Sequence, residues 1–304
     1  MAALASTGAA PTGTAGAPTG AQACDRTCLN GYLDRYLKAL SARDPQQLPW
    51  ARNARFTENA APLKPGDGLW GTLTGLGTYK LYVDDPQAGQ AGMLTVVDEN
   101  GRPALMSLRL KIANGQIVEA ETKIARTGEG QRLVTETLKT APASFAEALS
   151  PTDRPSRAEL IRIADSYFDA IEHSDGNLVP FAADGFRIEN GVRTCNNPNP
   201  VPRPDRDVVW QKLSAMPCRQ GFSSHVFSYI KSIEPRRYDV VDVEHGVVFA
   251  DPVFNHPGTI LTIDAPGLGK FDMTQSDWAS HPTGALITEV FKIKNRQIVE
   301  VAAV

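Results

Sequence analysis

The chain contains the same stretch twice. Residues 36–59 read YLKALSARDPQQLPWARNARFTEN, and residues 167–190 read YFDAIEHSDGNLVPFAADGFRIEN. The two align without a gap at an offset of 131, and seven of the 24 positions are identical. A second echo pairs LKIANGQIVE (residues 110–119) with FKIKNRQIVE (residues 291–300), at an offset of 181 with seven of ten identical. The period is too long for a solenoid repeat, so the sequence predicts two copies of one domain.

The spacing of the two echoes sets the predicted domain boundaries. We predict a first domain at residues 24–126, a linker at 127–155, and a second domain at 156–304 that carries 50 more residues (181 − 131) between its echoes. Residues 1–23 consist mainly of Ala, Gly, Thr and Pro without any charge. Such a segment cannot bury enough apolar surface to order itself, so we expect it to be disordered.

Hydrophobic periodicity predicts the main elements. An apolar stripe at helical spacing predicts a helix over residues 26–42, and Ser156 with Glu159 forms a capping box that opens a second one. Asn100-Gly101 and Asn114-Gly115 indicate two-residue hairpin turns. Strands are expected at residues 55–59, 79–83, 93–97, 105–112 and 117–124, then 225–233, 237–243, 247–254, 260–263, 284–293 and 297–301; short helices are expected at 131–139 and 208–215.

The pieces YLKAL…D…LP, TEN, GDGLWGT and RLKIANGQIVEAE resemble the NTF2-like superfamily and, within it, the SnoaL-like domains. The resemblance covers residues 24–126 and 156–304. It implies an α+β fold of two tandem cones, each a curved antiparallel sheet wrapped around helices and enclosing a pocket. Members of the superfamily include dehydratases, ketosteroid-type isomerases, epoxide hydrolases, polyketide cyclases, and binding or scaffold proteins. The catalytic Asp/His pair of the SnoaL-type cyclases has no matching position in this sequence, so no catalytic residue is transferred from it.

Composition excludes several classes of partner. The net charge of −3 gives no basic footprint for nucleic acid, and no run approaches the roughly 18 apolar residues needed to span a membrane. Standard catalytic motifs for phosphate, dinucleotide, serine-hydrolase or zinc-protease chemistry are absent, and the five His residues show no metal-ligand spacing. The sequence therefore predicts no cofactor and no metal.

Four cysteines occur as two local pairs, Cys24 with Cys28 and Cys195 with Cys218. An even count with local pairing predicts two disulfides and a secreted or periplasmic location. Four free thiols in a cytosolic protein are the alternative. Residues 21–23 have the Ala-x-Ala form of a cleavage site, but the segment before them lacks the basic start and apolar stretch of a signal peptide.

Glu58-Asn59 and Glu189-Asn190 form the most repeated polar pair. A carboxylate beside a carboxamide at a strand end could act as base and oxyanion donor. The alternative is that the pair ties the strand end to a neighbouring loop, and its presence in both copies favours this structural role. Arg187 and Glu189 point to one face of their strand, where they could bind substrate or simply pair with each other.

Glu289 replaces a leucine at a position predicted to be buried. In the first copy Met106, Leu108 and Leu110 share the apolar face of a strand, and at an offset of 181 Glu289 stands where Leu108 does. A buried carboxylate must be paired or have a raised pKa, which is how a general base or acid near neutral pH arises. The alternative is a salt bridge to one of three arginines, Arg193, Arg236 or Arg237.

His225, Phe227 and Tyr229 alternate on one face of a predicted strand. If that face is concave, it presents an imidazole and a phenol to the second cone, with Phe227 and Arg193 as further substrate contacts. We therefore expect any active site in the second domain, with Arg193, His225 or Tyr229 near Glu289.

Together these observations predict a cofactor-independent lyase, isomerase or hydrolase that acts on a small, partly apolar organic molecule. A secreted binding protein without chemistry is the first alternative. The second is a scaffold whose sheet faces serve partners, including another copy of the chain. The number of ionisable groups converging on an apolar pocket discriminates between the enzyme and the binding protein.

Overall fold

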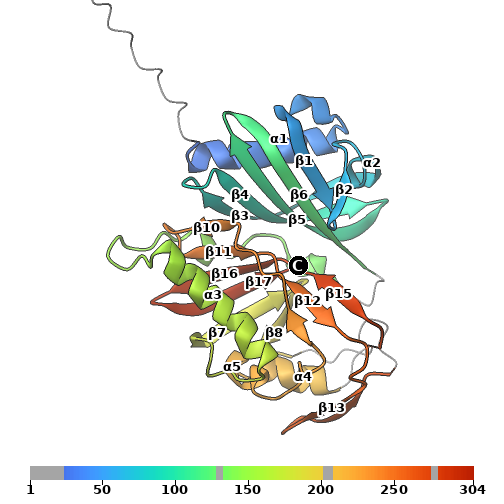
Figure 1. Ribbon diagram of the computed structural model, residues 1–304, viewed down its shortest axis with the longest axis vertical. Helices are drawn as coiled ribbons and strands as arrows, with labels where there is room; N and C mark the ends of the chain where they lie inside the picture. Colours follow the sequence, from blue (N-terminus) through green and yellow to red (C-terminus); the bar gives the residue numbers. More distant parts are fainter. Residues whose placement is uncertain (1–23, 128–132, 201–207, 275–279) are drawn as a thin grey trace, which may run out of the picture.

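The computed structural model describes residues 24–127, 133–200, 208–274 and 280–304 (Figure 1). These residues form an α+β protein with two six-stranded sheets, as expected, but each sheet is mixed rather than antiparallel throughout, because it contains one parallel strand pair. Two helices of 16 residues accompany them, α1 (Arg26–Ser41) and α3 (Arg157–Glu172). The segment at residues 1–23 that was expected to be disordered lies outside the described residues.

The first sheet has the strand order β2-β1-β6-β5-β4-β3, in which β1 runs parallel to β6 and the other neighbours are antiparallel. Both predicted Asn-Gly turns join its strands, and all four of their residues have positive φ, between 50° and 74°. The strands are β1 (Trp50–Glu58), β2 (Ala61–Leu63), β3 (Leu73–Asp85), β4 (Gln90–Glu99), β5 (Arg102–Ala113) and β6 (Gln116–Arg126). A short helix, α2 (Leu69–Thr72), precedes β3, and a 3₁₀ turn, η1 (Pro45–Gln47), precedes β1.

The second sheet has the order β10-β11-β16-β17-β7-β8, with β7 parallel to β17. Its strands are β7 (Phe181–Glu189), β8 (Val192–Cys195), β10 (Val240–Asp242), β11 (Val247–Ala250), β16 (Glu289–Lys294) and β17 (Gln297–Ala303). Smaller elements surround it: β9 (Ser232–Ile233), β12 (Val253–His256) and β15 (Thr283–Leu286) in one sheet, the hairpin β13 (Thr262–Ala265) with β14 (Gly269–Asp272), the helices α4 (Val208–Ala215) and α5 (Cys218–Phe222), and the 3₁₀ turns η2 (Thr135–Thr137) and η3 (Ala143–Ala146).

The two sheets correspond strand for strand. Read from β8 to β10, the second sheet repeats the order of the first read from β2 to β3. The register corresponds as well, because Phe56 pairs with Ala120 as Arg187 pairs with Val301, at the offsets of 131 and 181. The β3–β4 pair matches β10–β11 at an offset of 157. The additional residues of the second half therefore fall into two insertions, one between β8 and β10 and one between β11 and β16.

Each long helix covers one face of its own sheet. Asp25 caps α1 by accepting from the backbone N–H of Cys28, and Ser156 caps α3 by accepting from Glu159, as the capping box predicts. The apolar stripe of α1 packs against β1, β4, β5 and β6, and that of α3 packs against β11, β16 and β17. Burial of these stripes, more than helix propensity, stabilises both helices.

The outer faces of the two sheets pack against each other, so the layers run helix, sheet, sheet, helix (Figure 1). Tyr79 and Leu81 of the first sheet share a buried cluster with Val247, Phe249 and other residues of the second. The Phe249 ring approaches Gly92 so closely that a Cβ there would lie 2.6 Å from it. Glycine at position 92 therefore permits this contact between the two halves.

Ion pairs also join the halves. Lys123 of β6 donates to Asp251 and, at 2.9 Å, to the carbonyl of Ile287. The Arg26 guanidinium contacts Asp84 at 3.0 Å and Asp242 at 2.7 Å, one carboxylate from each half. The halves thus share an apolar interface flanked by charged contacts.

Several predicted elements differ from the observed ones. The strand expected at residues 225–233 is wrong except for Ser232–Ile233, because residues 224–229 form turns and His225 has φ = 60°. Burial there follows Val226, Tyr229 and Ile230, which is the spacing of a turn rather than of a strand. The strands expected at 247–254 and 284–293 are each divided into two. The helix at 208–215 is confirmed, whereas the one expected at 131–139 reduces to η2, and residues 131 and 132 lie outside the described ranges.

Candidate functional site

Two disulfides are present, as predicted. The Cys195–Cys218 bond joins β8 to α5 with a Cα–Cα separation of 5.0 Å, and the Cys24–Cys28 bond spans the start of α1 with 5.3 Å. Two disulfides favour an extracellular or periplasmic location. Among the described helices, none has the length and apolar character needed to cross a membrane.

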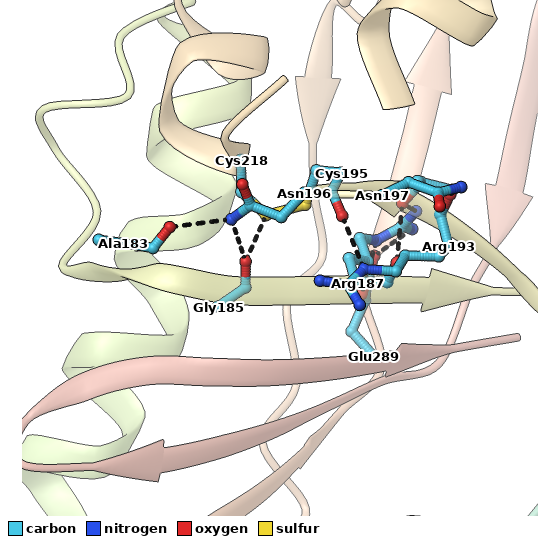
Figure 2. The surroundings of a disulfide bond; sticks show 10 residues. Ala183, Gly185, Arg187, Arg193, Cys195, Asn196, Asn197, Cys218 and Glu289 are labelled. Atoms are coloured by element: carbon cyan, nitrogen blue, oxygen red, sulfur yellow. Dashed lines mark hydrogen bonds and ion pairs between the residues drawn. A yellow bond between two sulfur atoms is a disulfide. The ribbon is translucent and has the colours of Figure 1, made fainter. Parts of the chain in front are cut away.

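Beside the Cys195–Cys218 bond, a buried ion pair joins two strands of the second sheet (Figure 2). The Glu289 side chain is 0% exposed, and it accepts from Arg187 Nη2 at 2.9 Å and from Nε at 3.4 Å. These two contacts form a side-on fork between guanidinium and carboxylate. Glu289 faces the interior of the second half, because Phe291 and Ile293 of the same strand face lie in the core under α3.

The observed partner of Glu289 is none of the three arginines expected from the sequence. Arg236 pairs instead with acidic residues of α3, and Arg237 pairs with Glu121 at 2.6 Å. Arg193 lies 4.2 Å from the ring of Phe186, which points to the sheet face opposite Arg187. Because β17 lies between β7 and β16, it brings the Arg187 and Glu289 strands to the same part of the core.

Arg187 contacts three further side chains. Its Nη1 donates to Glu189 Oε2 at 2.9 Å and to Thr194 Oγ1 at 3.3 Å. The Tyr167 phenol, fully buried in α3, interacts electrostatically with Arg187. The guanidinium therefore has two carboxylates, a hydroxyl and a phenol around it, and Arg187 and Glu189 do pair with each other.

Burial and charge shift the pKa values of this cluster in different directions. Burial raises the pKa of Glu289 above its usual range, and the attraction of Arg187 offsets only part of that effect. Burial opposes charge on Arg187, but Glu189 and Glu289 outweigh it and hold the pKa of Arg187 well above its ordinary value. Burial also raises the pKa of the Tyr167 phenol. Glu289 is therefore a more basic carboxylate than an exposed glutamate.

The first half has apolar residues at the two central positions. Phe56 stands where Arg187 does and Leu108 where Glu289 does, and both are buried in the core under α1. Glu58, the counterpart of Glu189, accepts from the backbone N–H of Leu69 at 2.8 Å and so caps α2. The first half therefore uses the corresponding carboxylate for structure. Glu58 also pairs with Arg126 at 3.3 Å, whereas the positions of Phe56 and Leu108 carry no charge.

The carboxamide of the repeated Glu-Asn pair has a structural role in the first half. Asn59 Oδ1 accepts from the backbone N–H of Ile124 at 2.8 Å, which ties the end of β1 to β6. Asn190 occupies the corresponding turn with φ = 51°, and its backbone N–H donates to the Ala303 carbonyl at 3.0 Å. For Asn59, the structure thus agrees with the alternative in which the pair ties the strand end to its neighbour.

The remaining residues expected at the site are described by other neighbours. His225 is exposed on a turn rather than on a concave strand face. Tyr229 is buried with its ring 5.5 Å from that of His256, and Phe227 packs 6.1 Å from Phe222. The strand prediction is wrong for this segment, so these three residues do not alternate on one strand face.

Two members of the cluster were missed from the sequence. Tyr167 belongs to the repeated stretch, where it repeats Tyr36, and its helical spacing places it with core residues. Thr194 carries no sequence signal, because it follows the end of the first echo. The contact of each with Arg187 depends on how β7, β8 and α3 meet in the fold.

One other group of residues has the spacing of a metal site. Carboxylate oxygens of Glu121, Asp239 and Asp251 lie within 4.8 Å of one another between the two halves. Arg237 pairs with all three, and Lys123 contacts Asp251. These cations already neutralise the carboxylates, so the trio is accounted for as an interdomain ion-pair network.

The fold and cluster together define an α+β protein with two corresponding sheets and a buried arginine–carboxylate centre in the second. The chain belongs to the family described as a domain of unknown function, DUF8021, which matches residues 153–304. That match covers the second half and includes every member of the cluster. No curated protein matches the chain.

Solved structures similar to this chain include SnoaL-like and ketosteroid isomerase-like folds. A putative SnoaL-like polyketide cyclase from Jannaschia sp. CCS1 is 11% identical over 52% of this chain and 90% of its own, with a TM-score of 0.28. A hypothetical protein with a ketosteroid isomerase-like fold from Catenulispora acidiphila, solved with trimethylamine, is 12% identical over 30% and 82%, with a TM-score of 0.20. AclR, a putative hydroxylase from Streptomyces galilaeus, is 10% identical over 39% and 89%, with a TM-score of 0.24.

Proposed function

We propose that the second half is a cofactor-independent acid–base enzyme for a small, partly apolar organic molecule, centred on Arg187, Glu189 and Glu289. The observation that carries the proposal is the paired replacement of Phe56 and Leu108 by Arg187 and Glu289 at corresponding positions. A buried ion pair seldom adds stability over a well-packed apolar pair of similar volume. A catalytic role would explain why the core of the second half contains two charged residues where the core of the first half has two apolar ones.

Within the proposed site the three side chains have different roles. Glu189, with 37% of its side chain exposed, is the carboxylate that solvent and substrate reach, and it accepts the proton. Arg187 orients Glu189 and stabilises the anion that develops as the proton leaves. Glu289 is fully buried and fixes Arg187 through the side-on fork. Proton abstraction followed by elimination, isomerisation or epoxide opening fits this arrangement.

The proposal includes the origin of the chain. We infer two copies of one NTF2-like domain, at residues 24–126 and 156–304, joined by a linker at 127–155. The shared strand order and register of the two sheets support it. In this arrangement the outer sheet faces bury each other. They are thus occupied within the chain, which disfavours a scaffold that offers those faces to partners or to a second copy.

Solvent deuterium exchange tests the proposal with a panel of candidate substrates. The protein is incubated in D₂O with small ketones, enones and epoxides, and label uptake or conversion is followed by mass spectrometry. We expect Glu189→Gln and Glu289→Gln to slow any reaction on the order of a hundredfold or more. Glu58→Gln is the matched control, because it changes the corresponding carboxylate of the first half. Wild-type rates in both site variants, or no conversion of any compound by the wild type, would reject the enzyme.

A further inference from the structure

The second half has one more residue than the first in the edge strand beside Arg187. In the first half Phe56, Thr57 and Glu58 pair in regular register with Leu63, Pro62 and Ala61. In the second half Arg187 pairs with Cys195 but Ile188 pairs with Arg193, so the register shifts by one. The additional residue is Thr194. Such a β-bulge bends a strand and redirects a side chain, and bulges are over-represented beside active sites.

The bulged residue contacts Arg187 twice. Thr194 Oγ1 accepts from Arg187 Nη1 and donates to the Arg187 carbonyl, each at 3.3 Å. The same Nη1 donates to Glu189. The two hydrogens of Arg187 Nη1 therefore go to two acceptors, Thr194 and Glu189. The hydrogen bond to Thr194 orients the guanidinium and thereby the hydrogen bond to Glu189.

The residues after Thr194 are held at several points (Figure 2). Cys195 is bonded to Cys218 of α5, and both cysteines are buried. Asn196 donates from its side chain to the carbonyls of Ala183 and Gly185 and from its backbone to that of Met216. These contacts fasten the end of a four-residue edge strand that has β7 as its only neighbour in the sheet of described residues.

We propose that Thr194 is a positioning residue that aims Arg187 at Glu189, and that the Cys195–Cys218 bond holds the bulge in place. A catalytic consequence of this positioning rests on the proposed function. The orientation of the Arg187 guanidinium by Thr194 does not depend on it. Without the hydroxyl, the fork on Glu289 remains but Nη1 loses one of its two fixed acceptors.

Titration of the glutamate carboxyl groups by ¹³C NMR tests the inference without a substrate. Thr194→Val removes the hydroxyl and keeps the side-chain shape. We expect the Glu189 titration midpoint to rise by about half a pH unit, the equivalent of one modest hydrogen bond. Thr194→Ser keeps the hydroxyl and is expected to restore the wild-type midpoint. Thr78→Val is the control, because its hydroxyl bonds the Lys139 carbonyl at the surface of the first half.

The role of the disulfide is tested in the same experiment. Cys195→Ala with Cys218→Ala should raise the Glu189 midpoint in the same direction, and adding Thr194→Val should shift it no further, because both changes release one contact. Unchanged midpoints in the Thr194→Val variant would overturn the inference. So would a shift that Thr194→Ser fails to reverse. Shifted midpoints together with wild-type exchange rates in both Glu189→Gln and Glu289→Gln would support the positioning and reject the enzyme.

Discussion

Arg187 Nη2 lies 2.9 Å from Glu289 Oε1 at the two positions that Phe56 and Leu108 hold in the first half. The charges are complementary, and Glu289 without Arg187 would be an isolated buried charge at a cost of several kcal/mol. Arg187 without Glu289 would keep the partly exposed Glu189 as its counter-charge. The two residues thus form one unit, and their substitutions are expected to be strongly coupled.

The first prediction concerns this coupling. Arg187→Phe alone should lower the free energy of unfolding by about 3–5 kcal/mol, because it leaves the fully buried Glu289 unpaired. Glu289→Leu alone should lower it less, because Arg187 keeps its ion pair with Glu189. The double variant, which reproduces the residues of the first half, should recover most of that loss. Urea denaturation of the four proteins forms a double-mutant cycle that measures the coupling.

Lys270→Ala is the control for this cycle. It breaks a pair with Asp264 in which the side chains are 75% and 71% exposed, so we expect no measurable change. If the double variant loses as much as the two single variants combined, the coupling is zero and the two residues stabilise the core independently of each other. The functional interpretation would then lose its main support.

The sequence predicted the parts of this centre that depend on local periodicity. The echoes predicted two corresponding sheets, and alternation along one strand placed Glu289 in the core. The partner of Glu289 was not predictable, because Arg187 is 102 residues away and reaches it only through the order β7-β17-β16. Each of four arginines would have satisfied the same charge rule.

Two other errors have different physical causes. His225 was placed on a strand because aromatic residues alternate there, but a segment that starts after a short helix buries residues at turn spacing instead. Thr194 could not be found, because a bulge adds one residue without changing composition or periodicity. Irregular features of this kind depend on tertiary contacts. The repeated stretch ends at residue 190, so it does not cover the bulge at Thr194.

The second prediction concerns the interface between the halves. Lys123→Met should lower the free energy of unfolding by about 3 kcal/mol, because it removes the closest cation from Asp251, whose side chain is 2% exposed. Lys111→Met is the matched control on the neighbouring strand. Lys111 is 43% exposed and 3.8 Å from Glu119, so its loss should cost about 0.5 kcal/mol or less. Equal effects in the two variants would show that the Lys123 contact does not hold the halves together.

The third prediction separates the two disulfides. The Cys195–Cys218 bond closes a segment of 23 residues and the Cys24–Cys28 bond one of four. Loop-closure entropy then gives contributions of about 3.4 and about 2 kcal/mol. Thermal and urea denaturation of the two Cys→Ala double variants should show the larger loss for Cys195 and Cys218. A larger loss for Cys24 and Cys28 would mean that this disulfide stabilises the protein by more than loop closure. It would then also hold the start of α1, where Arg26 contacts Asp242.

The last prediction is a pH dependence that originates at Asp84. Burial raises the pKa of Asp84 from 3.8 to about 6, and the neighbouring Asp242 adds to the rise, although Arg26 opposes it. Between pH 3.8 and 6 the folded protein keeps a proton that the unfolded chain releases. Stability therefore falls as pH rises through this window, by up to about 3 kcal/mol for this group.

Asp84→Asn mimics the protonated form at every pH. Relative to wild type, the variant should gain up to about 3 kcal/mol of stability between about pH 4 and about pH 7, measured by urea denaturation at both values. Asp34→Asn should show the opposite trend at lower pH, because Lys80 and Tyr82 hold the pKa of Asp34 below its usual value despite partial burial. Its stability should fall relative to wild type as pH rises toward about 4, and the difference should stay constant above that value. A stability difference between Asp84→Asn and wild type that is the same at both pH values would show that Asp84 titrates normally in the folded protein.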